Sequence, residues 1–286
     1  MTGHGATGRH VSGPSLTGPG ATGRADLHLH SLASDGTAGI DEILAAALAV
    51  DLQVIAITDH DRIDAAQAGQ ALARRRGLAI EVVVGEEIST RGGHLLGLWL
   101  TEPIKPWQSL RTSIVQVHEQ GGLAIPAHPL FPYPLCAQGV ILRRLIADPD
   151  PRCRPDAIEV FNPTTFGRPV HGRVVRFAEA HGLAAVGNSD AHAAEAIGRG
   201  STTFAGRSAD ELRAAILARE IGWQGTFHAT AGQLGTFGSQ LRKYGRDLRD
   251  ETRGRIRNDG TGRDHGYPGG RHRPPRFDTG PEDDPR

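Results

Sequence analysis

The 286-residue sequence predicts an α/β fold in which strands and covering helices alternate around a parallel sheet. Three observations support this fold class. Seven short apolar runs alternate with longer helix-like segments between residues 25 and about 225. The runs are continuous in Val, Ile, Leu and Ala, as expected of parallel strands that are covered on both faces. Aromatic residues make up only 5% of the chain, whereas hydrophobic residues make up 38%, so we expect an aliphatic core.

The predicted strands and helices follow one another regularly. The apolar runs predict strands at 25–30, 53–58, 79–84, 94–100, 122–127, 157–161 and 183–188. Helices are predicted at 40–50, 64–76, 107–120, 169–181 and 208–220. The first helix follows a Ser-Asp-Gly-Thr turn, the second ends in three arginines before Gly77, and the third runs from just after Pro106 to Gly121. These are typical helix boundaries, and the alternation indicates βαβ units.

The two ends of the chain differ in composition from its middle. Residues 1–24 are rich in Gly, Thr, Ser and Pro, so we expect them to be disordered. Residues 25–225 form one predicted domain. Residues 226–286 are predicted to be a mostly disordered tail rich in Arg, Gly and Pro, with a short amphipathic helix indicated by the spacing of Leu241, Tyr244 and Leu248. The arginines of this tail could bind nucleic acid, but the interleaved acidic residues favour a solvated segment.

Charge and cysteine content limit the classes of function. The chain has 32 Lys and Arg residues and 32 Asp and Glu residues, so no net field attracts polyanions. Two cysteines, Cys136 and Cys153, fit a reducing compartment and argue against a zinc-thiolate site. The sequence has no apolar run of the length that a signal peptide or a membrane helix needs. We therefore expect a cytoplasmic protein without membrane association, and no stable protein partner is indicated.

Histidines and acidic residues gather at the ends of the predicted strands. The carboxyl ends of the strands of a β/α barrel meet at one rim, so these side chains are expected to become neighbours. Packing imidazoles and carboxylates together is costly unless a cation compensates their charge. Ligands without thiolate suit Zn, Mn or Fe, and there are more of them than one ion can use. The pattern predicts a multinuclear metal site built from His28, His30, Asp35, His60, Glu86 or Glu87, His94, His128, Asp190 and His192.

Other residues near these strand ends allow more than one interpretation. We expect at least one of Asp26, Asp59 and Asp61 to orient a metal-bound imidazole rather than bind metal itself. Glu159 and Asn162 lie at another strand end, where they could meet substrate or cap a turn.

Seven motifs, taken in order, resemble the PHP family, named for polymerases and histidinol phosphatases. They are DLHLHSLASDGT, ITDHDRID, VVVGEEIST, HLLGLWL, IPAHPL, IEVFN and GNSDAH, within residues 25–225. The stretch NSDAHAAEAIGRGSTTF and the following ADELRAAILAR resemble the PHP-associated C-terminal region. The resemblance implies a distorted (β/α)7 barrel with a multinuclear metal site at the C-terminal ends of the strands.

The resemblance also implies a ligand set for two to three divalent ions, which could be Mn, Zn or Fe. His28, His30, Glu87 and Asp190 would bind one ion, and Glu87 would bridge to a second held also by His94 and His128. A third would take Asp35, His60 and His192. Asp35 stands where some members, including certain phosphatases, have His, which leaves the phosphatase subgroup open.

A metal-dependent phosphoesterase is the function that this ligand set favours. We expect Glu87, His128 and Asp190 to be catalytic, because two bridged cations lower the pKa of a shared water and create hydroxide for attack on phosphorus. Arg168, Arg199 and Asn162 are the candidate substrate-binding residues, with Arg91 as a further candidate; for the arginines, a role in surface solubility is the alternative.

The family resemblance favours small phosphorylated nucleotides as substrate. The expected substrate is a nucleoside 3′,5′-bisphosphate or a short RNA cut from its 5′ end. The alternatives are a phosphomonoesterase acting on histidinol phosphate and a non-catalytic, metal-binding regulatory module.

Overall fold

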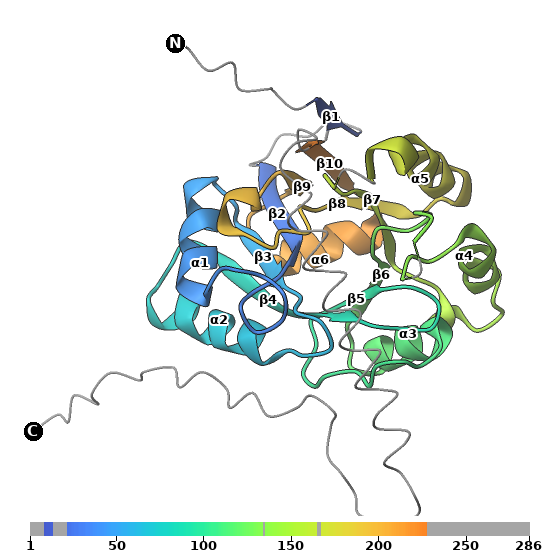
Figure 1. Cartoon of the computed structure of the whole chain (residues 1–286), viewed down its shortest axis with the longest axis horizontal. Coiled ribbons are helices and arrows are strands. Elements are labelled where there is room, and N and C mark those ends of the chain that lie inside the picture. Colours follow the sequence, from blue (N-terminus) through green and yellow to red (C-terminus); the bar gives the residue numbers. More distant parts are fainter. Residues whose placement is uncertain (1–8, 14–21, 134, 165–166, 228–286) are drawn as a thin grey trace, which may run out of the picture. The chain divides into compact units, whose positions relative to one another are not determined.

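A curled eight-stranded sheet forms the centre of the structure, a computed structural model that describes residues 9–13, 22–133, 135–164 and 167–227 (Figure 1). Its strand order is β1-β10-β9-β2-β3-β4-β5-β6. The strands are β1 (His10–Ser12), β2 (Thr22–Leu29), β3 (Val54–Ile57), β4 (Glu81–Ile88), β5 (Leu95–Leu98), β6 (Leu123–Pro126), β9 (Gly200–Ala205) and β10 (Ile221–Thr226).

Two further strands pair with each other between the ends of this sheet. These are β7 (Ala157–Phe161) and β8 (Ala184–Gly187), which run parallel. Near the start of β7, the Asp156 amide donates to the Ala124 carbonyl of β6 over 3.0 Å. The Gly187 amide of β8 donates to Oγ1 of Thr202 in β9 over 3.1 Å. The β7-β8 pair therefore contacts both β6 and β9, and the curled sheet approaches a barrel.

Six helices cover this framework. They are α1 (Ile40–Ala49), α2 (Asp64–Arg75), α3 (Leu110–Glu119), α4 (Gly139–Ile146), α5 (Gly167–His181) and α6 (Ala209–Ala218), with short 3-10 turns at Pro151–Cys153 and Ala194–Ala196. Local signals explain two of the helix starts. The Ser109 hydroxyl accepts from the Thr112 amide at the start of α3, and Ser208 and Glu211 form a capping box at the start of α6.

The α/β fold class is confirmed, but the expectation of a wholly parallel sheet is wrong. Strands β2, β3 and β4 are parallel, whereas β5 is antiparallel to both β4 and β6. Strands β9 and β10 also run antiparallel to their neighbours. The physical reason for β5 is the short connection from Ile88 to Leu95, because a parallel crossover needs about a dozen residues or more.

Strand direction decides which ends meet at the rim. The carboxyl ends of β2, β3, β4 and β8 lie together, as the isolated bridges Leu29–Ala191 and His60–Glu87 show. Because β5 is antiparallel, its amino end, rather than its carboxyl end, reaches the same rim. This direction explains how His94, which precedes a strand, can lie beside residues that follow strands.

The core is aliphatic, as predicted, and lies on both faces of the central strands. In β3, Val54 and Ala56 belong to one buried cluster, while Ile55 and Ile57 belong to another. Side chains alternate between the two faces of a strand, so each face of the sheet is covered by apolar groups. This two-sided burial explains why the strands are continuous apolar runs.

The structure corrects the predicted boundaries. Strand β1 and the first residues of β2 lie within residues 1–24, for which disorder was expected. Backbone pairing orders these polar residues, since β1 pairs with β10 and Thr22 with Ala205. The predicted domain end at 225 falls one residue before the end of β10. Helix α4 and strands β9 and β10 were not predicted.

Nearly all of the predicted tail, including the helix at 241–248, lies outside the described residues. Within the described ranges, no helix has the length and apolarity that a membrane crossing requires.

Candidate metal centre

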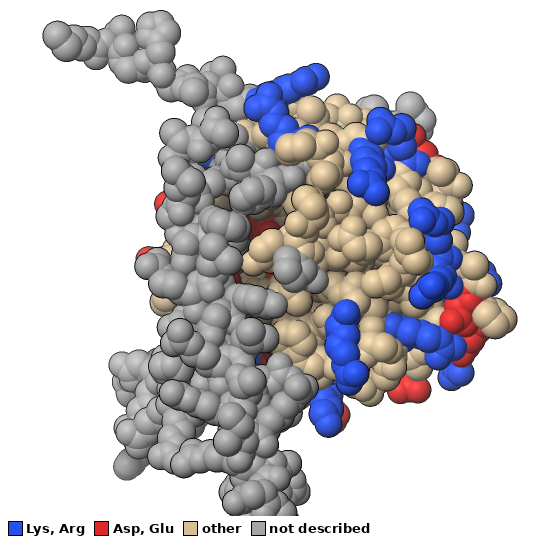
Figure 2. Space-filling model, turned by 45° about the vertical axis from the view of Figure 1, so that its right-hand side comes forward, with Lys and Arg blue, Asp and Glu red and all other residues tan. Residues whose placement is uncertain are grey.

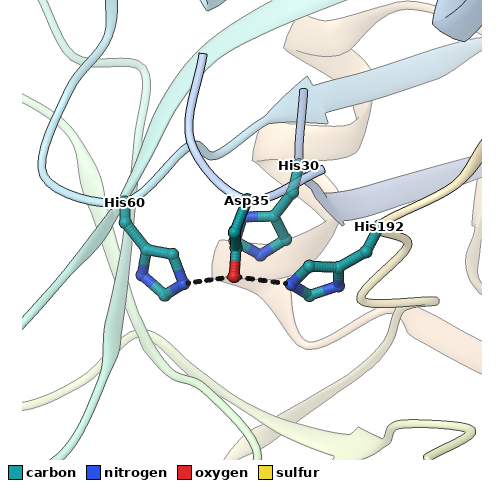
Figure 3. A group of neighbouring side chains, drawn as sticks. All are labelled: His30, Asp35, His60 and His192. Carbon is teal, nitrogen blue, oxygen red and sulfur yellow. Dashed lines mark ion pairs between the residues drawn. The ribbon is translucent and has the colours of Figure 1, made fainter. Parts of the chain in front are cut away.

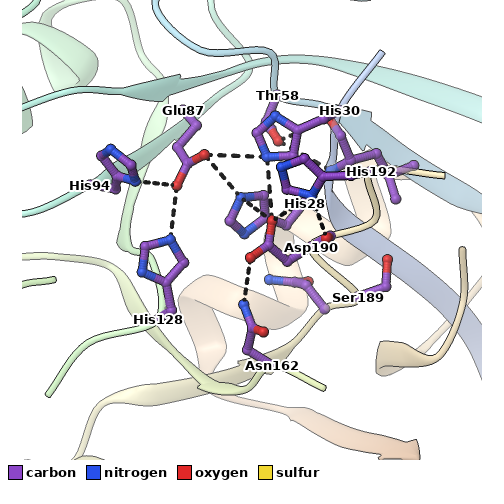
Figure 4. A network of polar contacts seen from close by, with 12 residues as sticks. His28, His30, Thr58, Glu87, His94, His128, Asn162, Ser189, Asp190 and His192 are labelled. Carbon is purple, nitrogen blue, oxygen red and sulfur yellow. Dashed lines mark hydrogen bonds and ion pairs between the residues drawn. The ribbon is translucent and has the colours of Figure 1, made fainter. Parts of the chain in front are cut away.

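Nine histidine and acidic side chains converge at this rim (Figure 3 and Figure 4). They come from β2, β4 and the segments that adjoin the rim ends of β2, β3, β5, β6 and β8. All nine belong to the set predicted from the sequence: His28, His30, Asp35, His60, Glu87, His94, His128, Asp190 and His192.

Glu87 is the central carboxylate of this group. Its side chain is almost completely buried, and its two oxygens face different imidazoles. Oε1 lies 2.8 Å from His94 Nδ1 and 3.0 Å from His128 Nε2. Oε2 lies 3.2–3.3 Å from the ring nitrogens of His28, His30 and His60. Of the two candidate glutamates, Glu87 is the one whose carboxylate lies among the imidazoles, in a position that suits a bridging ligand.

Two aspartates complete the carboxylate set. Asp190 Oδ1 lies 3.4 Å from Nε2 of both His28 and His30. Asp35 lies between His60 and His192, with Oδ2 3.6 Å and 3.2 Å from their Nε2 atoms (Figure 3). The backbone φ of Asp190 is +49°, a conformation that is costly outside glycine and that clusters at functional sites.

The chemistry of these donors fits divalent cations. The rings of His28 and His30 are buried, and their Nε2 atoms, like Nδ1 of His94, have no hydrogen-bond partner within the described part of the chain. Candidate ligand atoms in each of four subsets lie within 4.8 Å of one another. Buried nitrogens that make no hydrogen bond are costly in an apolar interior, and a cation shared with the nearby carboxylates would satisfy both groups.

The imidazoles and carboxylates of the centre stabilise each other's charged forms. Burial opposes charge on His30, but Asp190, Asp35 and Glu87 outweigh it and raise the pKa of this imidazole to about 10. Burial likewise opposes ionisation of Glu87, but the imidazoles of His94, His60 and His28 hold the pKa of its carboxyl well below the usual range. Protons on the imidazoles thus balance the carboxylates without a cation. Metal binding would displace these protons.

Glu159, in the middle of β7, contacts two of the predicted ligands. Its Oε1 lies 3.0 Å from Nδ1 of His28 and accepts from Asn188 Nδ2 over 2.8 Å. Its Oε2 accepts from the His128 amide over 2.7 Å and from Asn162 Nδ2 over 3.3 Å. The contact with Nδ1 directs Nε2 of His28 towards Glu87 and Asp190. Sequence reasoning left this role unassigned, although the position at a strand end was the available signal.

Two further residues position the ligands. Asn162, predicted to bind substrate, donates from Nδ2 to Asp190 Oδ2 over 3.0 Å and so holds that carboxylate. The buried, unpaired Cys136 places its Sγ 3.3 Å from Nδ1 of His128. Cys136 therefore contacts a ring whose other nitrogen faces Glu87, a role that the sequence did not indicate.

Asp26, Asp59 and Asp61 hold the loops that carry the ligands. Asp26 accepts from the amides of Ser189 and Gly198 over 3.0 Å and 2.9 Å. Asp59 accepts from the amide and hydroxyl of Ser31, and Asp61 from the Ser89 amide. It stays a prediction that one of these three acids orients an imidazole. Glu159, by contrast, contacts the His28 ring directly.

The two arginines predicted to bind substrate lie apart from this network. Arg168 and Arg199 are both exposed. Among the described residues, neither side chain makes a hydrogen bond or ion pair with the nine residues of the centre. Their role in substrate binding stays a prediction.

Glu86 points away from the centre and has a different chemistry. It is fully buried, its Oε2 accepts from the Ile104 amide over 2.8 Å, and its Oε1 has no hydrogen-bond partner among the described residues. Burial raises the pKa of this carboxyl to about 8 from an ordinary value of 4.5. Glu86 is thus protonated in the native state at neutral pH, while the unfolded chain has lost the proton.

This shift predicts a pH-dependent stability. Between pH 4.5 and 8 the native state binds a proton that the unfolded state does not, so the free energy of unfolding falls as pH rises. The slope due to Glu86 is up to about 1.4 kcal/mol per pH unit. Glu86→Gln should flatten the pH dependence. Urea unfolding in EDTA at several pH values measures it, with exposed Glu102→Gln as control; unchanged slopes in both variants would contradict the assignment.

Comparison with known proteins identifies the family. Residues 26–125 match the family model described as PHP domain, and residues 169–221 match the one described as PHP-associated. An uncharacterized protein of Methanocaldococcus jannaschii is 36% identical over 150 residues, which are 49% of this chain and 81% of the relative. A 5′-3′ exoribonuclease of Haemophilus influenzae is 41% identical over 81 residues, but these are only 27% of this chain and 29% of the exoribonuclease.

A solved structure shares the fold. It is a two-domain protein from Bacteroides vulgatus containing a predicted PHP-like metal-dependent phosphoesterase, with a TM-score of 0.60, 19% identity, and coverage of 80% of this chain and 70% of that one. This similarity supports the fold, and the family matches agree with the buried cluster of histidines and carboxylates. The chain belongs to the PHP family of metal-dependent phosphoesterases and has a PHP-associated C-terminal region.

Proposed function

We propose that this phosphoesterase hydrolyses small phosphorylated nucleotides, either a nucleoside 3′,5′-bisphosphate or the 5′ end of a short oligoribonucleotide. The observation that carries the chemistry is the position of Glu87, whose two oxygens lie 2.8–3.3 Å from five imidazole rings. The nucleotide specificity is supported by the similarity to a protein named 5′-3′ exoribonuclease, which covers 27% of this chain.

The proposed ligands form three overlapping groups. One ion would be held by His28, His30, Glu87 and Asp190, a second by Glu87, His94 and His128, and a third by Asp35, His60 and His192. Groups of donors within 4.8 Å of one another contain His28, His30 and Glu87, and Asp35, His60 and His192, which supports the first and third sites. The second site is supported by Glu87 Oε1, which lies 2.8 Å from His94 and 3.0 Å from His128. Two to three Mn, Zn or Fe ions, when bound, would supply Lewis-acid chemistry and lower the pKa of a nearby water.

The protein's own residues prepare this reaction by position and charge. Glu87 keeps its carboxylate ionised, as its lowered pKa shows, and places one oxygen towards each half of the centre. Glu159 fixes His28 and the backbone of His128, and Asn162 fixes Asp190. We assign catalytic roles to Glu87, His128 and Asp190. We further propose that Arg168 and Arg199 bind phosphate oxygens through their guanidinium groups.

A direct comparison of substrates tests this proposal. Full-length protein reconstituted with manganese should release phosphate or nucleotide from a nucleoside 3′,5′-bisphosphate and from a short 5′-phosphorylated RNA. Phosphate release and chromatography of the products would measure both reactions, with EDTA-treated protein as control. Faster release from histidinol phosphate would contradict the nucleotide assignment. No turnover of any phosphoester by the metal-loaded protein would instead indicate a binding or regulatory module.

A further inference from the structure

A pocket outside the nine-residue centre lies between the loop after β4, the start of α3 and helix α4. Its volume is about 300 Å³, near the lower end for pockets that bind small ligands. Apolar side chains and guanidinium groups line it together, from Leu110, Ile141, Leu145, Arg91, Arg111 and Arg144. The loop packs closely here, because a Cβ at Gly92 would lie 2.8 Å from Cβ of Leu110.

The charge around this pocket is positive. Arg111 is neutralised by Asp148, with Nε 2.8 Å from Oδ2. Arg91 uses its Nε to donate to the Trp107 carbonyl over 2.7 Å, which fixes the guanidinium. Across the described ranges, neither Arg91 nor Arg144 forms an ion pair with a carboxylate. Figure 2, in which the side of α3, α4 and α5 comes forward, shows Lys and Arg side chains spread over this face.

One residue that lines the pocket, Arg91, lies close in sequence to two residues of the metal centre. Arg91 lies between Glu87 and His94 in sequence, three residues before His94. Three residues span at most about 11 Å between Cα atoms. This distance is within the reach of a few nucleotides of one strand. A nucleic acid strand that ends at the centre can therefore reach the pocket.

We propose that this pocket is a subsite for an internal nucleotide of an oligoribonucleotide substrate. Arg91 and Arg144 would bind a phosphate, since guanidinium groups pair with phosphate oxygens in a fork. The base would lie against the apolar side chains and an arginine plane, as unstacked RNA bases do on proteins. This inference rests on the proposed nucleotide-directed activity and goes beyond it by favouring short RNA over a mononucleotide.

The double variant Arg91→Ala/Arg144→Ala tests the subsite. With manganese-loaded full-length protein, KM for a 5′-phosphorylated hexaribonucleotide should rise about tenfold or more. Its kcat, and both constants for a nucleoside 3′,5′-bisphosphate, should stay unchanged. The salt dependence of log KM should become shallower by about 0.7, because the contacts to one phosphate are lost. Arg74→Ala/Arg75→Ala, at exposed positions of α2, removes the same charge elsewhere and should leave all of these values unchanged.

The outcomes separate this inference from the proposed function. If the bisphosphate is turned over but KM for the RNA in the double variant stays within twofold of wild type, the subsite is wrong. If the wild type hydrolyses neither nucleotide, fluorescence anisotropy with the labelled RNA in EDTA still tests the pocket. Weaker binding by the double variant than by the control variant supports the subsite, and equal binding overturns it. If polyglutamate displaces the labelled RNA as well as unlabelled RNA does, the pocket is a general anion contact and the subsite is overturned.

Discussion

Replacing Glu87 with glutamine is expected to lower kcat by at least about a thousandfold. Each oxygen of this carboxylate faces a different group of imidazoles, with Oε1 2.8 Å from His94 and Oε2 3.2 Å from His30. An amide removes the negative charge and replaces one oxygen with an NH2 group, which cannot act as a metal ligand. The bridge between the two halves of the centre is lost, so the effect should appear in kcat and not only in KM.

The neighbouring residue provides a matched control for this variant. Glu86 is also buried, but successive side chains of a strand point to opposite faces, and its Oε2 accepts from the Ile104 amide. Glu86→Gln should therefore keep most of the activity. Steady-state kinetics with saturating manganese compare the two variants, and circular dichroism checks that both are folded. Activity of Glu87→Gln within tenfold of wild type would show that Glu87 is not the bridging ligand.

Replacing Glu159 with glutamine is expected to weaken metal affinity by about 10-fold to 100-fold. Four donors surround this carboxylate, from His28, the His128 amide, Asn162 and Asn188. The NH2 group of glutamine would face at least one of them, so the ring of His28 would no longer be held with Nε2 towards the centre. Glu159 is a positioning residue, because it acts through His28 and His128.

A metal titration distinguishes positioning by Glu159 from a general loss of structure. Competition with a chelator gives the metal affinity of the variant, and kcat should recover towards the wild-type value as manganese is raised. Glu179→Gln, an exposed position on α5, is the control and should leave the affinity unchanged. Unchanged metal affinity in Glu159→Gln would contradict the role, and so would low activity that saturating manganese does not restore.

The ligand set was accessible from sequence because the fold places strand ends together. His28 and His30 lie two residues apart at the end of one strand, and Asp190 and His192 follow another. Parallel strands of a curled sheet share one rim, so chemical type and position at a strand end were sufficient to predict these neighbours. The core composition was predictable for a related reason, since two-sided burial demands continuous apolar runs.

Other features depend on tertiary contacts that a single sequence does not encode locally. Position near a strand end cannot distinguish a metal ligand from a residue that positions the ligands. Glu159 and Glu87 are the same residue type and differ in which side chains surround them. The antiparallel direction of β5 follows from the short connection between Ile88 and Leu95, which cannot hold a parallel crossover. Strand β1 has only three residues and is exposed at both ends, and it is held by pairing with β10 and by packing of Val11 against the core.

Metal content is the most direct test of the central claim, that distant histidines and carboxylates form one multinuclear centre. Elemental analysis of full-length protein, purified without chelator and reconstituted with manganese or zinc, should find two to three ions per chain. The same treatment of Glu87→Gln should find fewer. A folded wild-type protein that retains no divalent transition metal would contradict the account.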